Sequence, residues 1–387
     1  MTRRRNVFWP TVNPFEQSPE YIAQEIEPDI SLLASGNAAG MGLDELKLLF
    51  TRLDEAPYRA LQAFEGIYKH RWDDWDRFTN LPKSLRNRLA SAVQIKWPEI
   101  ERTLTSSDGS SKHILKLADS YSIECVYMPY ENRATLCVST QAGCAMGCAF
   151  CATGAMGLKR NLTSAEIVGQ AMSLLIYHRP AEMTPINIVF MGMGEPLHNF
   201  EQVMEAFAVL SHPKGLAIPP RRVTVSTAGL APGIKRLGEY NPRPRLALSL
   251  NATTNEARSK IMPVNSKWNL EALSQALRSF PLEPGERITL EYALIEGISD
   301  GLEDAERLSR FAGQFPSKIN LIPYNACPGA GLPELSPPSD ARINEIGAYL
   351  ANRGHVVSVR RSRGSDVGGA CGQLALLRFY SKRCGTQ

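Results

Sequence analysis

The sequence predicts an α/β protein whose parallel sheet is preceded by a small helical domain, and three observations lead to this prediction. From residue 134 onward, short β-rich runs alternate with segments of helical periodicity, and repeats of this kind build parallel sheets. Before residue 93 the apolar pattern is helical alone. Between these parts, residues 114–128 (ILKLADSYSIECVYM) alternate as a β-hairpin does.

Size and composition agree with this architecture. The 387 residues are enough for one large α/β domain and a small one, and 43% hydrophobic residues is ordinary for a globular protein. A formal charge of +4, from 43 basic and 39 acidic residues, suits a polyanionic partner but is far from the composition of a dedicated nucleic-acid binder. No apolar run is long enough to cross a bilayer, and the N-terminus lacks the apolar segment of a secretory signal, so we expect a cytoplasmic protein. Eight cysteines in such a chain indicate metal ligands or reactive thiols.

The N-terminal part is expected to contain an extension and a helical unit. Four prolines interrupt residues 1–40, which predicts an irregular extension. Helical spacing over 43–50, 58–72 and 84–93 predicts a helical accessory domain over residues 41–105. Its basic side chains either touch phosphates or form a solvated helix face; they are Lys69, Arg71, Lys83, Arg86 and Arg88.

The remaining chain is expected to form a connector, a sheet domain and a tail, over 106–130, 131–378 and 379–387. Six β-rich runs lie at 134–139, 186–193, 222–229, 245–251, 287–295 and 318–325, and a last strand is expected within 355–362. Representative helices are expected over 164–178, 200–210, 270–280, 301–315 and 339–353. Six units are consistent with an incomplete (β/α) barrel, and periodicity alone does not separate this from an open doubly wound sheet.

A cysteine-rich loop follows the first of these strands. Cys144, Cys148 and Cys151 have the spacing C-x-x-x-C-x-x-C in GCAMGCAFCATG. Three thiolates so close in sequence can hold an iron–sulfur cluster and leave one iron open. Structural zinc is the weaker interpretation because it usually needs four protein ligands, and three small buried residues or a disulfide are the bland alternatives.

Further candidates stand where the other strands end, because the carboxyl ends of parallel strands form the active site in such folds. Gly-rich GMGEP (192–196) follows the second run, although a plain turn is the default interpretation of such a segment. Ser226, the segment Ser249–Asn251, and Asn325 end later runs.

Four motifs together resemble a known family. RATLCVSTQAGCAMGCAFCATG, MGMGEP, NLIPYN and ACGQL, in this order, are similar to motifs of the radical S-adenosylmethionine (SAM) enzymes that methylate C2 of adenine in RNA, the dual-specificity RNA methyltransferases. The similarity covers about residues 42–378. It implies an incomplete (β/α)6 radical-SAM barrel with an N-terminal helical domain that helps to grip RNA. It also implies a [4Fe-4S] cluster on Cys144, Cys148 and Cys151 whose fourth iron is chelated by SAM.

The resemblance assigns SAM contacts to seven residues, namely Gly194, Glu195, Ser226, Ser249, Leu250, Asn251 and Asn325. The sequence departs from the family at Asn251, where the family usually has histidine. Asparagine still donates and accepts hydrogen bonds but does not titrate near neutrality.

The resemblance also assigns catalytic residues. Cys371 lies in GSDVGGACGQ, a glycine-rich segment that suits a thiol serving two partners, although a small buried residue in a turn is the alternative. In the family the matching cysteine is itself methylated, Cys137 matches the second catalytic thiol, and Glu124 matches the proton acceptor. The family has side chains where this chain has Gly368 and Gly369. The other cysteines match no family role and are interpreted as structural or incidental: Cys125, Cys327 and Cys384.

The implied reaction consumes two SAM molecules per turnover. One SAM methylates Cys371, and the second is cleaved to a 5′-deoxyadenosyl radical that takes a hydrogen from the S-methyl group. The resulting carbon radical adds to C2 of adenine, an unactivated carbon that ordinary nucleophilic transfer does not reach. After electron loss and deprotonation by Glu124, Cys137 attacks Cys371, and a disulfide frees the methylated base.

The implied substrate is adenine 2503 in 23S rRNA, at the peptidyl-transferase centre, in naked or partly assembled RNA. Members of the family also modify adenine 37 in some tRNAs. The base must be unstacked to enter the barrel, with phosphates held by basic residues that otherwise form a solvated surface: Arg221, Arg222, Arg360, Arg361 and Arg363. An electron donor such as flavodoxin or ferredoxin is required, and a monomer is the default state.

Two rival functions stay open at this point. The nearer is methylation of C8 of the same rRNA adenine, which confers antibiotic resistance and uses the same cluster and thiols. The farther is a non-enzymatic RNA-binding protein whose cysteines hold a structural metal, which has no need for Cys137 and Cys371.

Overall fold

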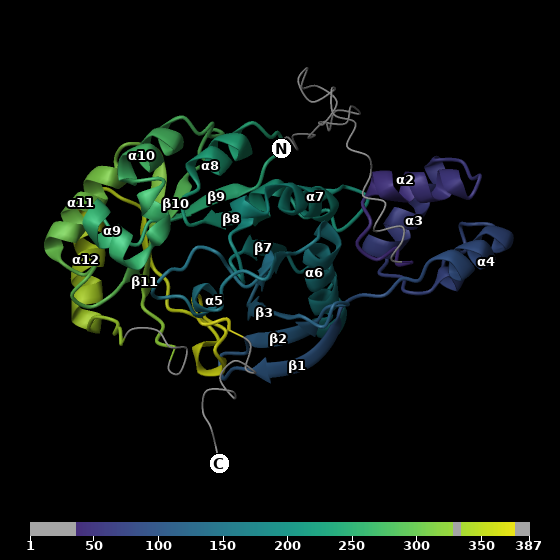
Figure 1. Cartoon of the computed structure of the whole chain (residues 1–387), viewed down its shortest axis with the longest axis horizontal. Coiled ribbons are helices and arrows are strands. Elements are labelled where there is room, and N and C mark those ends of the chain that lie inside the picture. The colour runs from purple at the N-terminus through teal and green to yellow at the C-terminus, as the bar shows by residue number, and fades with distance from the viewer. Residues whose placement is uncertain (1–35, 328–333, 376–387) are drawn as a thin grey trace, which may run out of the picture.

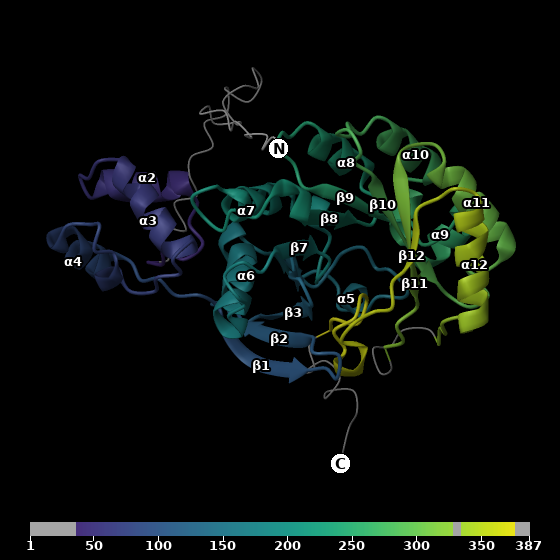
Figure 2. The same cartoon turned by 180° about the vertical axis from the view of Figure 1, so that it is seen from behind.

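The protein is described by a computed structural model that places residues 36–327 and 334–375 (Figure 1). Cys384, the predicted tail over 379–387 and all but the end of the predicted extension over 1–40 lie outside the described residues. The helical unit and the sheet domain lie side by side in both views (Figures 1 and 2).

The N-terminal unit contains the three expected helices, α2 (Leu43–Arg52), α3 (Tyr58–Tyr68) and α4 (Lys83–Ala92). The backbone N–H of Gly42 donates to Glu45 Oε2 at the start of α2, which stabilises the first turn. Helix α3 ends earlier than the pattern predicted, because the backbone turns and Arg71 takes a φ of 56°. The unit packs on the sheet domain through Phe64, whose ring lies 4.7 Å from that of His212.

Three antiparallel strands begin the sheet: β1 (Glu99–Thr105), β2 (Ser111–Lys116) and β3 (Ser122–Tyr130). The hairpin expected over 114–128 is formed by β2 and β3, with Ile114 opposite Glu124. Strand β1 corrects the assignment of residues 99–105 to the helical part. It forms one edge of the sheet, where a strand needs few apolar residues, and its sequence EIERTLT therefore lacks a clear β pattern.

The parallel part of the sheet contains each strand that was predicted from residue 134 onward: β4 (Arg133–Cys137), β7 (Ile186–Phe190), β8 (Val223–Thr227), β9 (Arg245–Ser249), β10 (Ile288–Leu294), β11 (Ser317–Pro323) and β12 (Val357–Val359). Their spatial order follows the chain, β4-β7-β8-β9-β10-β11-β12, with parallel pairing throughout. A doubly wound sheet would reverse its order at a switch point. The order therefore favours the incomplete barrel, which ends at β12.

Helices cover the outer side of this curved sheet (Figures 1 and 2). Helix α6 (Ser164–His178) coincides with its predicted range and begins with a capping box, in which Thr163 Oγ1 accepts from the N–H of Glu166 and Glu166 accepts from the N–H of Thr163. The other helices are α7 (Phe200–Ser211), α8 (Ala231–Gly238), α9 (Asn255–Ile261), α10 (Leu270–Arg278), α11 (Leu302–Ala312) and α12 (Asp340–Asn352). In the described part of the chain, no helix is both long and apolar enough for a membrane span.

Candidate active site

The three clustered cysteines lie on one closed loop. Strands β5 (Gln141–Ala142) and β6 (Arg160–Asn161) pair antiparallel and bring its ends together, and α5 (Ala152–Ala155) begins directly after Cys151. Gly143 allows the closure, because it takes a φ of 83° and an added Cβ would overlap the carbonyl oxygen of Gly157. The N–H of Cys151 donates to the carbonyl of Cys148 at 3.1 Å, which folds the second half of the loop.

The thiols of this loop interact with one another. Burial raises the pKa of Cys144 to about 12, and the nearby Cys151 and Glu195 also raise it. Burial raises the pKa of Cys148 well above its usual range, and Cys151 and Cys144 add to this effect. Burial also raises the pKa of Cys151. Buried thiols of this kind ionise when they coordinate a metal, whose charge replaces the lost solvation.

We tested whether this loop fits an iron–sulfur cluster. Among the residues that the structure describes, no three His, Cys, Asp or Glu side chains gather as ligands of one metal ion. A cubane cluster instead spreads its thiolates over separate iron atoms, so three buried and mutually interacting cysteines fit its donor set.

Gly194 and Glu195 follow β7 and face the cysteine loop. Gly194 has a φ of 106°, and a Cβ there would lie 2.6 Å from Gln141 Cβ, so only glycine fits. The Glu195 carboxylate is 3% exposed and accepts from the N–H groups of Leu197 at 3.0 Å and Ala228 at 2.7 Å. Burial raises the pKa of Glu195 to about 7, against the opposing effect of these hydrogen bonds.

The ends of β8 and β9 are joined by a buried arginine that the sequence analysis missed. Arg258 on α9 is fully buried and donates to the backbone carbonyls of Ala228 at 2.6 Å, Ser249 at 3.3 Å and Leu250 at 3.0 Å. Burial lowers its pKa to about 10, and the nearby Cys148 opposes this. A lone arginine in the polar helix NEARSKI carries no signal in sequence, because its partners are carbonyls of other elements. Ser226 lies on β8, next to Ala247 of β9.

Asn251 joins neighbouring elements at the end of β9. Its φ is 59°, a left-handed conformation that asparagine tolerates better than most residues. Its Oδ1 accepts from the N–H of Ala293 at 2.9 Å, and its Nδ2 donates to Met262 Sδ at 3.4 Å. The side chain thus ties the end of β9 to β10 and α9.

The segment that carries Cys371 lies against the cysteine loop. The N–H of Ala152 donates to the carbonyl of Gly372 at 2.8 Å, and Thr153 Oγ1 donates to the carbonyl of Leu374 at 2.5 Å. Figure 1 shows this yellow segment beside α5. These two hydrogen bonds join residues that are more than 200 positions apart in the chain. The tertiary fold therefore brings the predicted methyl-carrying thiol to the predicted cluster site.

Two side-chain amides, one on each side of the contact, join the same segment to the residues just beyond β11. Asn325 Nδ2 donates to Ser362 Oγ at 2.9 Å and to the carbonyl of Cys371 at 3.1 Å. Gln373, which the sequence analysis did not single out, donates from Nε2 to the carbonyl of Ala326 at 2.8 Å and accepts from the N–H of Ala370. Its place two residues after Cys371 in ACGQL was the only available signal.

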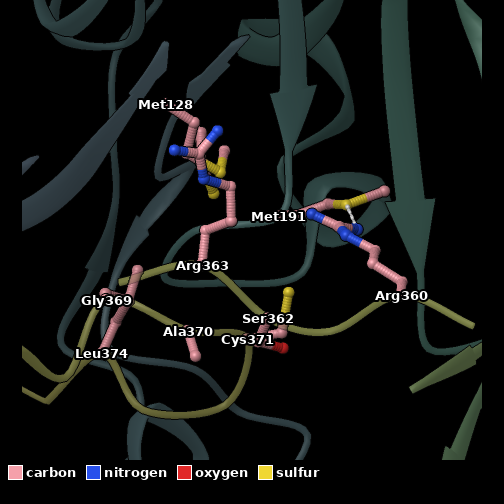
Figure 3. A pocket seen from close by; sticks show the side chains of 10 residues that line it. Met128, Met191, Arg360, Ser362, Arg363, Gly369, Ala370, Cys371 and Leu374 are labelled. Atoms are coloured by element: carbon pink, nitrogen blue, oxygen red, sulfur yellow. Dashed lines mark hydrogen bonds between the residues drawn. The ribbon is translucent and has the colours of Figure 1, made fainter. Parts of the chain in front are cut away.

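Cys137 and Cys371 line one pocket, and both are free thiols. In Figure 3 the sulfur of Cys371 points toward the space between Arg360 and Arg363. Burial raises the pKa of Cys137 to about 12; Cys371 raises it further, whereas Arg360 lowers it. The lining residues are Met128, Cys137, Met191, Arg360, Ser362, Arg363, Gly369, Ala370, Cys371 and Leu374.

Glu124 is not among the residues that line this pocket. It is fully buried on β3, its Oε1 lies 3.2 Å from Lys112 Nζ, and its Oε2 accepts from the N–H of Ala375 at 2.9 Å. Ala375 is four residues after Cys371, so Glu124 reaches the end of the segment that carries this thiol. Lys112 is a further residue that the sequence analysis missed, because a lysine in a strand usually faces solvent.

The other predicted residues have different surroundings. Cys125 is fully buried on β3, and Cys327 contacts the carbonyl of Gln373 at 4.0 Å, which fits their structural interpretation. Arg361 forms an ion pair with Asp340 at 2.9 Å, and Arg363 donates to the carbonyls of Pro129 and Asp108. Arg361 and Arg363 therefore have partners within the protein, and Arg360 lines the pocket with the thiols of Cys137 and Cys371.

Two family models match the chain. Residues 138–311 match the radical SAM superfamily, and residues 36–95 match the ribosomal RNA large subunit methyltransferase N-terminal domain. The first range contains the cysteine loop and the ends of β7, β8 and β9, and the second contains helices α2, α3 and α4.

Curated relatives and a solved structure extend this similarity over most of the chain. A dual-specificity RNA methyltransferase RlmN of Myxococcus xanthus is 47% identical and covers 88% of this chain and 90% of its own. RlmN of Pelobacter propionicus is 46% identical and covers 82% of this chain and 89% of its own. The crystal structure of a radical SAM methyltransferase from Sphaerobacter thermophilus superposes with a TM-score of 0.82 at 40% identity, covering 87% of this chain and 98% of that one.

Proposed function

Because the chain belongs to the RlmN family of dual-specificity RNA methyltransferases, within the radical SAM superfamily, we propose that it methylates C2 of adenine 2503 in 23S rRNA and C2 of adenine 37 in tRNA. The observation that carries this proposal is the shared pocket of Cys137 and Cys371 beside the cysteine loop. One thiol to carry the methyl group and a second to release it are what the proposed chemistry requires.

The residues at the ends of the strands would hold the cofactors. Cys144, Cys148 and Cys151 would ligate three irons of a [4Fe-4S] cluster. SAM would be held by residues at the ends of β7, β8, β9 and β11: Gly194, Glu195, Ser226, Ser249, Leu250, Asn251 and Asn325. When bound, the cluster and two SAM molecules per turnover supply the methyl group and the radical chemistry that an unactivated carbon needs.

Cys371 carries the methyl group in this proposal, as a methyl-cysteine. A thiolate is the nucleophile that a methyl transfer of this kind requires, and Arg360 is a cation that lines the pocket of both thiols. The hydrogen bond from Asn325 to the carbonyl of Cys371 positions the backbone at this residue.

Release of the base uses Glu124 and Cys137. Once the methylene carbon on Cys371 is bonded to C2 and one electron has been lost, Glu124 accepts the C2 proton. The Cys137 thiolate then attacks Cys371 Sγ, a sulfur–sulfur bond forms, and the bond between Cys371 Sγ and the methylene carbon breaks. The electron pair of that bond goes to the methylene carbon, which takes a proton and becomes the methyl group of the product.

The RNA must present an unstacked adenine to this pocket, so naked or partly assembled rRNA is the proposed substrate form. Arg221 and Arg222 precede β8 and are candidates for phosphate contacts. The reaction also needs an electron donor, and flavodoxin or ferredoxin is the proposed class. The proposed active form is a monomer without a membrane partner.

The test is mass spectrometry of the protein and of its RNA product. We expect a methyl group on Cys371 in protein purified with iron and SAM, an RNA adduct on Cys371 in Cys137→Ala, and 2-methyladenosine in the product. Finding 8-methyladenosine instead would show that the enzyme methylates C8 and not C2. Cys371 without a methyl group, with turnover surviving in Cys371→Ala, would overturn the two-thiol reaction.

A further inference from the structure

Lys112 is a charged residue in the interior that the proposed reaction does not yet use. Its side chain is 3% exposed, and its Nζ lies 3.2 Å from Oε1 of the fully buried Glu124. Burying both charges is costly, and a well-packed apolar pair of similar volume is often at least as stable. Stability alone therefore does not explain why this ion pair is buried here.

The sheet register directs Lys112 and Glu124 toward the catalytic thiols. Lys112 is opposite Val126 on β3, and Val126 is opposite Cys137 on β4. Residues opposite one another in an antiparallel pair share a face, and residues two apart on a strand do too. Lys112, Glu124 and Cys137 consequently project from one face of the sheet, the face on which the pocket lies.

Both members of the ion pair also meet the segment that carries Cys371. A Cβ added at Gly368 would lie 3.2 Å from Lys112 Nζ, and one at Gly369 would lie 3.7 Å from Lys112 Cβ. Glu124 Oε2 accepts from the N–H of Ala375 at 2.9 Å. Lys112 thus contacts the residues that precede Cys371 in the segment, and Glu124 accepts a hydrogen bond from a residue that follows Cys371.

We propose that Lys112 is the positioning residue for Glu124, holding it as a carboxylate aimed at the Cys371 segment, so that Glu124 accepts the C2 proton of the RNA adduct. This inference rests on the proposed function, which assigns that proton to Glu124. Burial favours the neutral acid of a carboxyl group, which accepts no further proton, and a neighbouring ammonium favours the carboxylate. The proton moves from C2 of the adenine to a carboxylate oxygen of Glu124.

The charged and titratable groups around Glu124 include Lys112 on β2 and the Cys125 thiol beside it on β3. Burial is the main cause that raises the pKa of the Cys125 thiol well above its usual range. This thiol is therefore neutral near pH 7. Lys112 supplies the positive charge next to Glu124 Oε1.

The experiment compares Lys112→Met with Lys112→Arg and Glu124→Gln in the full chain, loaded with iron and SAM and given RNA. For Lys112→Met we expect methylation of Cys371 to persist, the Cys371–RNA adduct to accumulate, and product release to slow by about a hundredfold, the usual scale for loss of a proton acceptor. The acid limb of the release rate should move to higher pH. Lys112→Arg should restore most of the rate, because it keeps the charge.

Lys116→Met, on the exposed end of the same strand, is the matched control and should leave all three readouts unchanged. If Lys112→Met acted only by disturbing the structure, it would also lower Cys371 methylation, and it would reduce the rate of product release by the same factor at every pH. Such uniform loss, or failure of Lys112→Arg to restore the rate, would overturn the inference. A normal rate of product release in Glu124→Gln would instead overturn the proposed role of Glu124. Blocked release in Glu124→Gln together with normal release in Lys112→Met would overturn the role of Lys112 alone.

Discussion

At the scale of single residues, Arg360 shows how burial redefines an expected role. Its sequence context, VRRSR, suggests phosphate contacts, yet its side chain lines the pocket with Cys137 and Cys371. One guanidinium N–H donates to Met191 Sδ at 3.8 Å, as Figure 3 shows. The pKa of Arg360 is raised chiefly by Cys371, with Glu291 and Cys137 adding to the effect. The reciprocal effect is a more stable thiolate at Cys137.

Arg360→Met is therefore predicted to suppress ionisation of Cys137. The thiolate forms as pH rises, and removing the cation lifts the pKa of Cys137 further above its value of about 12. Each unit of that rise lowers the thiolate fraction about tenfold at any pH below the pKa. Alkylation of Cys137, followed by peptide mass spectrometry as a function of pH, should slow accordingly. Arg360→Lys should keep most of the rate, and Arg361→Met, whose partner is the exposed Asp340, should keep all of it. Equal alkylation rates in Arg360→Met and the unaltered protein would contradict this account.

At the scale of elements, the cysteine loop depends on a close backbone approach. The short β5–β6 pair closes the loop, and Gly143 approaches Gly157 at the base of the loop. The N–H of Cys144 donates to the carbonyl of Gly157 at 3.2 Å across the same contact. The position of the first thiol is thus set by a contact that any side chain at residue 143 would push apart.

Gly143→Ala is predicted to abolish cluster binding. The added Cβ overlaps the Gly157 carbonyl oxygen, and the φ of 83° is also unfavourable for alanine. Iron and sulfide content with visible absorption of anaerobically purified protein should show the loss. Gly157→Ala is the matched control, since its φ is 66° but a Cβ there has nothing within 4 Å. That control should cost about 1–2 kcal/mol of folding stability and keep the cluster. A full cluster in Gly143→Ala would show that the loop tolerates the displacement.

At the scale of the whole molecule, the helical unit packs on the sheet domain through buried side chains that include Phe64. The Phe64 ring is 1% exposed, lies 4.6 Å from the Tyr68 ring, and contacts His212 just beyond α7. Tyr68 in turn donates from its hydroxyl to the carbonyl of Met41 at 2.6 Å. The contact between Phe64 and His212 joins the helical unit to the sheet domain, and the contacts of Tyr68 hold Phe64 in place within the unit. We expect this contact to orient the helical unit, and RNA bound to it, relative to the pocket.

Phe64→Ala is predicted to loosen this docking. Removing a buried aromatic side chain costs about 3–5 kcal/mol, and calorimetry should show an earlier transition for the helical unit, separate from that of the sheet domain. RNA affinity should fall, while iron content and Cys371 methylation stay unchanged. Tyr58→Ala on the same helix provides the comparison, because Tyr58 is 61% exposed and should affect neither transition. A single transition at the original temperature would show that Phe64 does not carry the interface.

The sequence by itself determined the type and order of the elements and the place of the motifs along the chain. Helix α6, strand β4 and strands β7 to β12 were predicted because their apolar periodicity is local and strong. Strand β1 was missed because an edge strand buries little and therefore shows no such period. The cysteine spacing was likewise readable, since the three proposed cluster ligands lie within a single loop.

Only the tertiary structure decided which of these residues meet. The order of the strands separated the incomplete barrel from a doubly wound sheet, and the contact between Thr153 and Leu374 brought the Cys371 segment to the cysteine loop. Arg258, Arg360 and the pair of Lys112 with Glu124 acquire their surroundings from elements far away in the chain. A charged side chain has no periodic signature of its own, so whether it faces solvent or a buried partner depends on the packing of the whole molecule.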